Sequence, residues 1–179
     1  MRRIVGIVGL TLLASIASAQ GISRAYWLLA GQAHEWCGYT DPSVFQGALI
    51  KQKPAESAIV TYTLGRLTEV IHQVQPQGAD WSVVDKYTPA SGGGLLLQRT
   101  SYLMRQNLQV VQSALIRAGR AAPALRVVAV NTLQGQKTAT AVPPLPNVPI
   151  ISDPATTPFM LVVTEMRHES VPTLCRKVR

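Results

Sequence analysis

The segment His34-Glu35-Trp36-Cys37 places an imidazole, a carboxylate and a thiol within four residues. A cysteine thiolate with a nearby histidine base is the nucleophilic pair of cysteine hydrolases. The base could be His34, His72 or His168. The segment therefore suggests a small hydrolase acting on peptide or cell-wall bonds, and this hypothesis requires Cys37 to be a free, reactive thiol.

The same side chains could also bind a metal ion. His34 and Cys37 have the separation of a ligand pair on a helix or turn, and His72 and His168 could complete four ligands. A structural zinc site usually shows two compact pairs, whereas His72 and His168 are isolated from each other in the sequence. We therefore expect no metal and no cofactor.

A disulfide is the third possibility for Cys37, because Cys175 is the only other cysteine in the chain. Two cysteines in an oxidising compartment most often pair with each other. The bond would close a loop of about 139 residues, for which the chain-entropy model gives roughly 5 kcal/mol. We predict a disulfide between Cys37 and Cys175, which would leave no thiol for hydrolysis.

The first twenty residues, MRRIVGIVGLTLLASIASAQ, have the pattern of a secretory signal peptide. Arg2 and Arg3 precede an apolar run over residues 4–13, and Ala17-Ser18-Ala19 forms a cleavage site of small residues. The apolar run is shorter than the roughly 20 residues that cross a bilayer. We expect residues 1–19 to be removed and residues 20–179 to form one secreted or periplasmic domain, without a transmembrane segment.

The charge balance is basic, with seventeen Lys and Arg residues against nine Asp and Glu residues. Removing residues 1–19 takes away two basic and no acidic residues, leaving fifteen against nine, or +6. Such a protein is expected to meet anionic partners, which outside the cytoplasm means lipid headgroups, cell-wall polymers or acidic proteins. Nucleic acid is not expected in that compartment.

Five arginines and no acidic residue lie between positions 99 and 126. We predict that they form an anion-binding surface if the fold brings them together, and an ordinary solvated face if it does not. These candidate residues are Arg99, Arg105, Arg117, Arg120 and Arg126.

Apolar residues at alternating steps of four and three predict helices over residues 22–36, 56–75 and 97–118. A further helix over 42–52 is predicted by Thr40-Asp41-Pro42, a capping side chain followed by proline at the first helical position. Within 56–75, the β-branched residues of AIVTYT favour a strand instead.

Four further segments have a strand-like pattern. We expect strands over residues 81–87, 125–133, 137–142 and 158–166, with a hairpin joining the second and third.

The proline-rich residues 143–149 lack the backbone donors of a sheet strand, so they should run as an extended surface connection. Such a stretch can also be a ligand for an aromatic groove. The predicted fold is therefore α+β, with three to four helices packed on a small antiparallel sheet.

Gly92-Gly93-Gly94 could present backbone N–H groups to an anion, with Arg99 and Arg105 nearby. The surrounding SGGGLLLQRTS matches neither G-x-G-x-x-G nor a P-loop, so nucleotide binding is not predicted. The run should instead mark a hinge or a close approach of two backbones.

These observations favour a secreted or periplasmic, non-catalytic binding protein with a basic surface and one disulfide. Its partner would be a protein or an anionic envelope component. The cysteine hydrolase and a subunit of an envelope assembly are the two alternatives.

Overall fold

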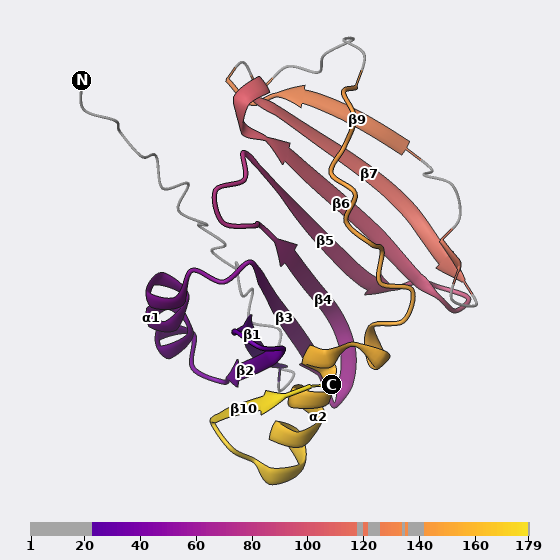
Figure 1. Cartoon of the computed structure of the whole chain (residues 1–179). Coiled ribbons are helices and arrows are strands. Elements are labelled where there is room, and N and C mark those ends of the chain that lie inside the picture. Colours follow the sequence, from indigo (N-terminus) through magenta and orange to yellow (C-terminus); the bar gives the residue numbers. More distant parts are fainter. Residues whose placement is uncertain (1–22, 118–119, 122–125, 134, 136–141, 179) are drawn as a thin grey trace, which may run out of the picture.

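The computed structural model describes residues 23–117, 120–121, 126–133, 135 and 142–178 (Figure 1). The predicted signal peptide and most of the predicted strand over 137–142 lie outside these residues. Within them, the chain forms one antiparallel sheet of ten strands and two α-helices.

The strands are β1 (Ser23–Ala30), β2 (Glu35–Tyr39), β3 (Glu56–Thr63), β4 (Arg66–Val74), β5 (Trp81–Pro89), β6 (Leu95–Leu103), β7 (Leu108–Arg117), β8 (Arg120–Ala121), β9 (Arg126–Asn131) and β10 (Thr173–Lys177). The helices are α1 (Pro42–Gln52) and α2 (Pro158–Glu169), with short 3-10 turns η1 (Met104–Gln106) and η2 (Pro154–Thr156). The strand order is β10-β2-β1-β3-β4-β5-β6-β7-β8, and β9 pairs with β7. From β3 to β8 the sheet is a meander, in which each strand pairs with the next one in the sequence.

The predicted α+β fold is wrong, because the described chain is predominantly sheet. In their described residues, the segments 22–36, 56–75 and 97–118, predicted as helices, each contain parts of two strands joined by a turn. In 56–75, the turn is Leu64-Gly65, where both residues have positive φ (51° and 75°). The apolar series that suggested a helix continues across this turn and combines residues of two strands. Within β3 itself, burial alternates with a period of two, as on a strand with one face buried.

The other two segments reverse direction in the same way. Ala33 and His34 have positive φ between β1 and β2, and Asn107 has positive φ after η1, between β6 and β7. In these segments, apolar residues taken from two strands and the turn between them also fit the spacing of a helix.

The segment 158–166 shows the opposite error, since the predicted strand is part of helix α2. Its buried residues have helical spacing; they are Phe159, Met160, Val162, Val163 and Met166. The valines favour a strand locally, but packing of the apolar face on the sheet outweighs this preference and stabilises the helix. Pro158 occupies the first turn, where a missing N–H is tolerated.

The predicted helix over 42–52 is confirmed as α1. The Asp41 carboxylate accepts hydrogen bonds from the backbone N–H groups of Ser43 (2.7 Å) and Val44 (3.3 Å), which caps the helix. The predicted strands over 81–87 and 125–133 correspond to β5 and β9.

The two helices pack on opposite faces of the sheet. α1 covers Leu29, Cys37 and Tyr39 through Phe45, on what we call the outer face. α2 packs on the other, inner face, where Leu28 lies in its core. A Cβ atom on Gly38 of β2 would overlap the sulfur of Met166, so the absence of a side chain at Gly38 allows α2 to approach.

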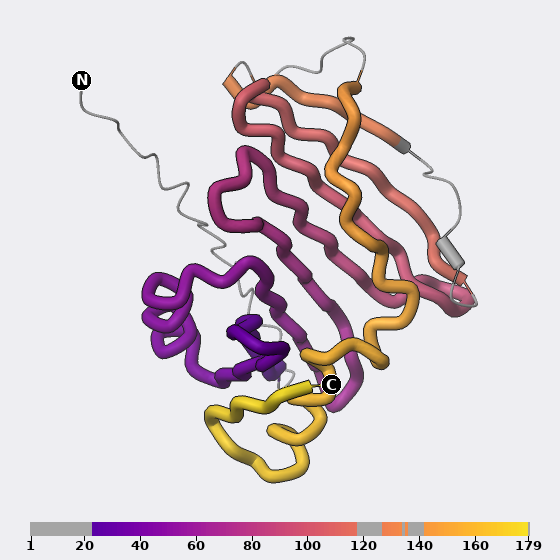
Figure 2. The backbone as a smooth tube through the Cα atoms, viewed as in Figure 1, coloured from indigo at the N-terminus to yellow at the C-terminus, as the bar shows by residue number. Residues whose placement is uncertain are grey.

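The inner face is also covered by residues 142–153, which we call the crossing segment (Figure 2). Residues 142–150 form no helix or strand. The crossing segment is held by side chains of the sheet: Arg99 donates a hydrogen bond to the Val148 carbonyl (2.7 Å), and the Tyr87 hydroxyl accepts one from the Ile151 N–H (3.1 Å). The proline-rich connection is extended, as predicted, and it lies against the sheet.

Neither helix of the described residues is both long and apolar enough to span a membrane.

Candidate anion-binding end of the sheet

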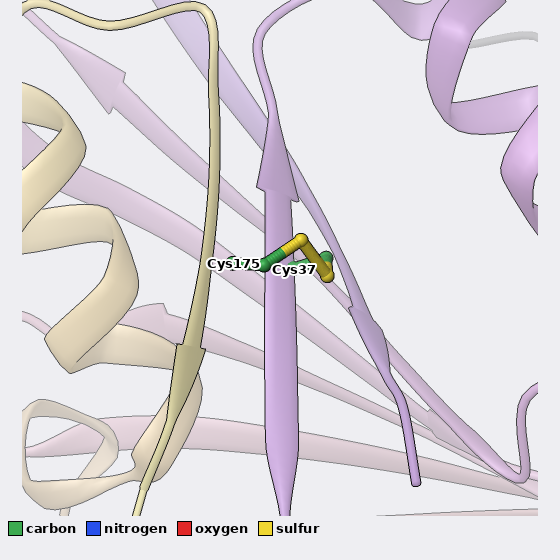
Figure 3. The surroundings of a disulfide bond; sticks show 2 residues. All are labelled: Cys37 and Cys175. Carbon is green, nitrogen blue, oxygen red and sulfur yellow. A yellow bond between two sulfur atoms is a disulfide. The ribbon is translucent and has the colours of Figure 1, made fainter.

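Cys37 and Cys175 are joined by a disulfide that connects neighbouring strands (Figure 3). Cys37 on β2 lies directly opposite Cys175 on the edge strand β10, with a Cα–Cα distance of 4.0 Å. The structure therefore contains the predicted bond. A hydrolase mechanism based on the Cys37 thiolate has no nucleophile in this state.

The histidines lie in three different surroundings. His34 is in the turn between β1 and β2, and His168 is exposed near the end of α2. His72 is buried on β4, where its Nε2 lies 3.4 Å from a Glu56 carboxylate oxygen and its ring stacks on Phe159. The hydrogen bond with His72 holds the pKa of Glu56 below its ordinary value. No group of three His, Cys, Asp or Glu side chains suited to a metal ion is present in the described part of the chain.

Arg99, the first of the predicted anion-binding residues, is engaged inside the protein. Its Nε and Nη2 donate to the two carboxylate oxygens of Asp85 (2.7 and 2.6 Å), and its Nη1 donates to the crossing segment. Asp85 is fully buried and also accepts a hydrogen bond from Tyr87. Burial, followed by the neighbouring Asp85 charge, raises the pKa of Tyr87 above its usual range. Arg99 therefore connects the sheet to the crossing segment.

Arg105 lies at the other end of the sheet from the remaining candidates. It is on η1, its side chain is highly exposed, and its Nε pairs with Asp80 at 2.8 Å. Together with Trp81 and the segment 144–146 it lines a shallow pocket.

Three of the five predicted arginines are brought together on β7, β8 and β9. Arg117 and Arg120 are directly opposite each other, and Arg126 is opposite Ser113. Ser113 and Arg117 are four residues apart on one strand, so these register positions share a face. That face is the outer one. Gln112 lies opposite Arg99, which points to the inner face, so the next residue, Ser113, belongs to the outer face. The Arg117 side chain is exposed.

These positions lie at what we call the hairpin end of the sheet. At this end β1 begins, the turns 64–65 and 90–94 are located, β7 ends and β8 begins. These turns and strand ends lie at the same end of the sheet because successive strands of a meander alternate in direction. The backbones come close together here, since a Cβ atom on Gly94 would overlap the Ile116 carbonyl oxygen.

Three further arginines at the hairpin end were not predicted as candidates. Arg24 lies opposite Tyr62, and Arg66 lies opposite Thr63 at the β3–β4 turn. Arg167, from α2, places its guanidinium carbon 3.9 Å from the centre of the Tyr62 ring, a cation–π contact. All three arginines are exposed.

The two ends of the strands differ in the charges that they carry among the described residues. The hairpin end carries six arginines: Arg24, Arg66, Arg117, Arg120, Arg126 and Arg167. The opposite end carries both signs: the carboxylates of Glu35, Glu56 and Asp80, and the cations of Lys53, Arg105, Arg176 and Lys177. Carboxylates also lie towards the hairpin end: Asp41 caps α1 just after β2, Glu69 is paired with Lys86, and Glu169 ends α2 two residues after Arg167.

The exposed arginines of the hairpin end have no carboxylate partner among the described residues. The exposed Lys51, Lys53 and Lys177 also form no ion pair within the described residues. Three other cations are paired, in Lys86–Glu69, Arg105–Asp80 and Arg176–Glu165. By contrast, no ion pair is formed by Arg24, Arg66, Arg117 or Arg167 within the residues described. Among the described residues, the arginines that are exposed and form no ion pair therefore lie at the hairpin end.

No protein-family model, curated protein or solved structure matches this chain.

The hairpin end is wide enough to contact an extended partner. Strands β1 and β7 are separated by β3, β4, β5 and β6. At a spacing of about 4.8 Å between neighbouring strands, Arg24 and Arg117 lie roughly 24 Å apart across the sheet. Arginines at this separation can contact several negative groups of one partner simultaneously.

Proposed function

We propose that this chain is an exported, non-catalytic binding protein that holds an anionic partner at its hairpin end. The observation that carries the proposal is the set of exposed arginines without carboxylate partners. Like charges at one end of a protein repel one another, and a bound anion removes that repulsion. Guanidinium groups also form strong paired hydrogen bonds with phosphate and carboxylate groups.

Export is supported by two independent features of the chain. The first twenty residues have the pattern of a signal peptide, and the mature segment contains a disulfide that joins its two ends. Disulfides form and persist in oxidising spaces, which include the bacterial periplasm and the exterior of the cell. The partner would accordingly be an anionic component of an envelope or an acidic protein.

Salt-dependent retention on a soluble anionic polymer tests the proposal. The mature protein is compared with a variant that neutralises four residues of the hairpin end: Arg24→Gln, Arg66→Gln, Arg117→Gln and Arg120→Gln. We expect this variant to elute from immobilised dextran sulfate at clearly lower salt, because it has lost four positive charges that attract the polymer. Salt elutes the protein because it screens exposed charges over about 8 Å at physiological ionic strength.

The control variant changes the net charge by the same amount at the opposite end. It carries Lys51→Gln, Lys53→Gln, Arg105→Gln and Lys177→Gln, all at exposed positions. Equal retention of the two variants would show that net charge alone is responsible and would contradict a binding site at the hairpin end.

A further inference from the structure

The tip of the β3–β4 hairpin presents an apolar side chain to solvent. Leu64 is 73% exposed and has φ of 51°, in the left-handed region. Two-residue turns of this kind favour Asn-Gly or Asp-Gly, whose polar side chains tolerate the left-handed conformation. Leucine at position 64 is thus unfavourable both in backbone conformation and in exposure, and neither fold nor solubility requires it.

The exposed leucine is surrounded by the unpaired cations of the hairpin end. Arg66 begins β4 two residues after Leu64, and Arg24 lies across the sheet from Tyr62. Arg167 is positioned by its contact with the Tyr62 ring and by a 3.5 Å hydrogen bond to the Gly65 carbonyl. An apolar tip bordered by guanidinium groups matches the boundary between anionic headgroups and acyl chains.

The adjacent loop leaves this end open to a flat surface. The β5–β6 loop consists of Ala90, Ser91 and Gly92 to Gly94. No bulky side chain of this loop therefore stands between the arginines of β1 to β4 and Arg117. A planar partner can approach both groups at once.

We propose that the anionic partner is a phospholipid bilayer, with Leu64 inserted at the headgroup–acyl boundary and the arginines on the lipid phosphates. This inference rests on the proposed anion-binding function and adds the class of partner. A soluble anionic polymer would use the arginines equally well but would gain nothing from Leu64.

Vesicle co-sedimentation tests the inference with the mature, disulfide-bonded protein. Vesicles of phosphatidylcholine alone are compared with vesicles that also contain about 30 mol% phosphatidylglycerol, at an ionic strength of about 0.1 M. We expect binding only to the anionic vesicles. Substituting Arg24→Gln and Arg66→Gln should weaken it about fivefold per arginine.

The decisive variant is Leu64→Asn, which creates the favoured Asn-Gly turn and so preserves the fold. We expect it to bind anionic vesicles about tenfold more weakly, because one apolar side chain no longer leaves water. Its retention on dextran sulfate should be unchanged. The matched control is Leu133→Asn, at an equally exposed leucine (76%) that follows β9 at the opposite end; its vesicle binding should equal that of the wild type.

The possible results separate the two proposals. Retention on dextran sulfate without binding to anionic vesicles overturns the bilayer as partner and leaves the anion-binding function intact, as for a cell-wall polymer. Vesicle binding that is insensitive to Leu64→Asn overturns insertion of the tip. Absence of binding to both dextran sulfate and anionic vesicles overturns the anion-binding function as well.

Discussion

Asp85 on β5 and Arg99 on β6 lie directly opposite each other, and their side chains form two hydrogen bonds beneath the crossing segment. The same row of the inner face continues to His72 on one side and Gln112 on the other. Carbonyl groups of an extended, proline-rich segment have no ladder partner, and Arg99 supplies hydrogen bonds to those of Val148 and Pro149. The ion pair therefore fixes the crossing segment on the sheet.

Replacing Arg99 should destabilise the protein strongly. In Arg99→Leu, the buried Asp85 carboxylate loses its countercharge and the Val148 carbonyl loses its donor. We expect the free energy of unfolding to fall by about 3–5 kcal/mol, measured by urea denaturation. Arg105→Leu breaks the exposed pair with Asp80 and should cost at most about 1 kcal/mol. Equal losses in the two variants would contradict the role assigned to Arg99.

The disulfide should contribute to stability mainly by restricting the unfolded chain. The double variant Cys37→Ala/Cys175→Ala should lose about 2–5 kcal/mol in free energy of unfolding. Wild-type protein in reducing agent should show the same shift of its urea midpoint, whereas the double variant should not respond to the reducing agent. A wild-type midpoint that is unchanged by reduction would contradict this prediction.

Gly93 and Gly94 allow a matched test of the close backbone approach at the hairpin end. Both have positive φ (86° and 91°), so alanine strains the backbone similarly at each position. A Cβ atom on Gly93 meets nothing within 4 Å, whereas one on Gly94 overlaps the Ile116 carbonyl oxygen. We expect Gly94→Ala to lose about 1–3 kcal/mol more than Gly93→Ala in thermal or urea denaturation. Equal losses would show that β7 does not lie against this loop.

The hydrogen bond between Glu56 and His72 should make stability depend on pH in the acidic range. Because the folded-state pKa of Glu56 is lowered from 4.5, its stabilising effect is fully present above about pH 5 and is lost as the pH falls through the folded-state value. The stability difference between wild type and Glu56→Gln should shrink over that interval. In a His72→Phe background this shrinkage should disappear, since no imidazole then lowers the pKa. A difference independent of pH in both backgrounds would contradict the coupling.

Local signals in the sequence predicted some elements well. Helix α1 follows from Asp41 and Pro42, because capping depends only on neighbouring residues. The disulfide follows from the pair of cysteines and the expected compartment, without knowledge of the fold. The strands β5 and β9 were found from their β-branched residues.

The hairpin end could not be predicted in the same way. TLGR at residues 63–66 is a turn, and its glycine is the signal that was available for it. The continuous spacing of apolar residues through Leu64 favoured a helix, which would have placed Arg66 on a solvated side and far from Arg24. In this segment, apolar residues of two strands and the exposed Leu64 happen to fall at steps of three and four, as on one helix.

The sequence by itself determined the composition, the basic balance, the candidate leader, the cysteine pair and one capped helix, because these depend on residue type or on short-range contacts. Only the tertiary structure decided which arginines are free and where they lie. Arg99 is paired with Asp85 beneath the crossing segment and is not available at the surface. The alternating strand directions brought Arg24, Arg66 and Arg117 to one end, where α2 adds Arg167. Both outcomes depend on strand register and chain direction, which link residues distant in sequence and leave no local pattern.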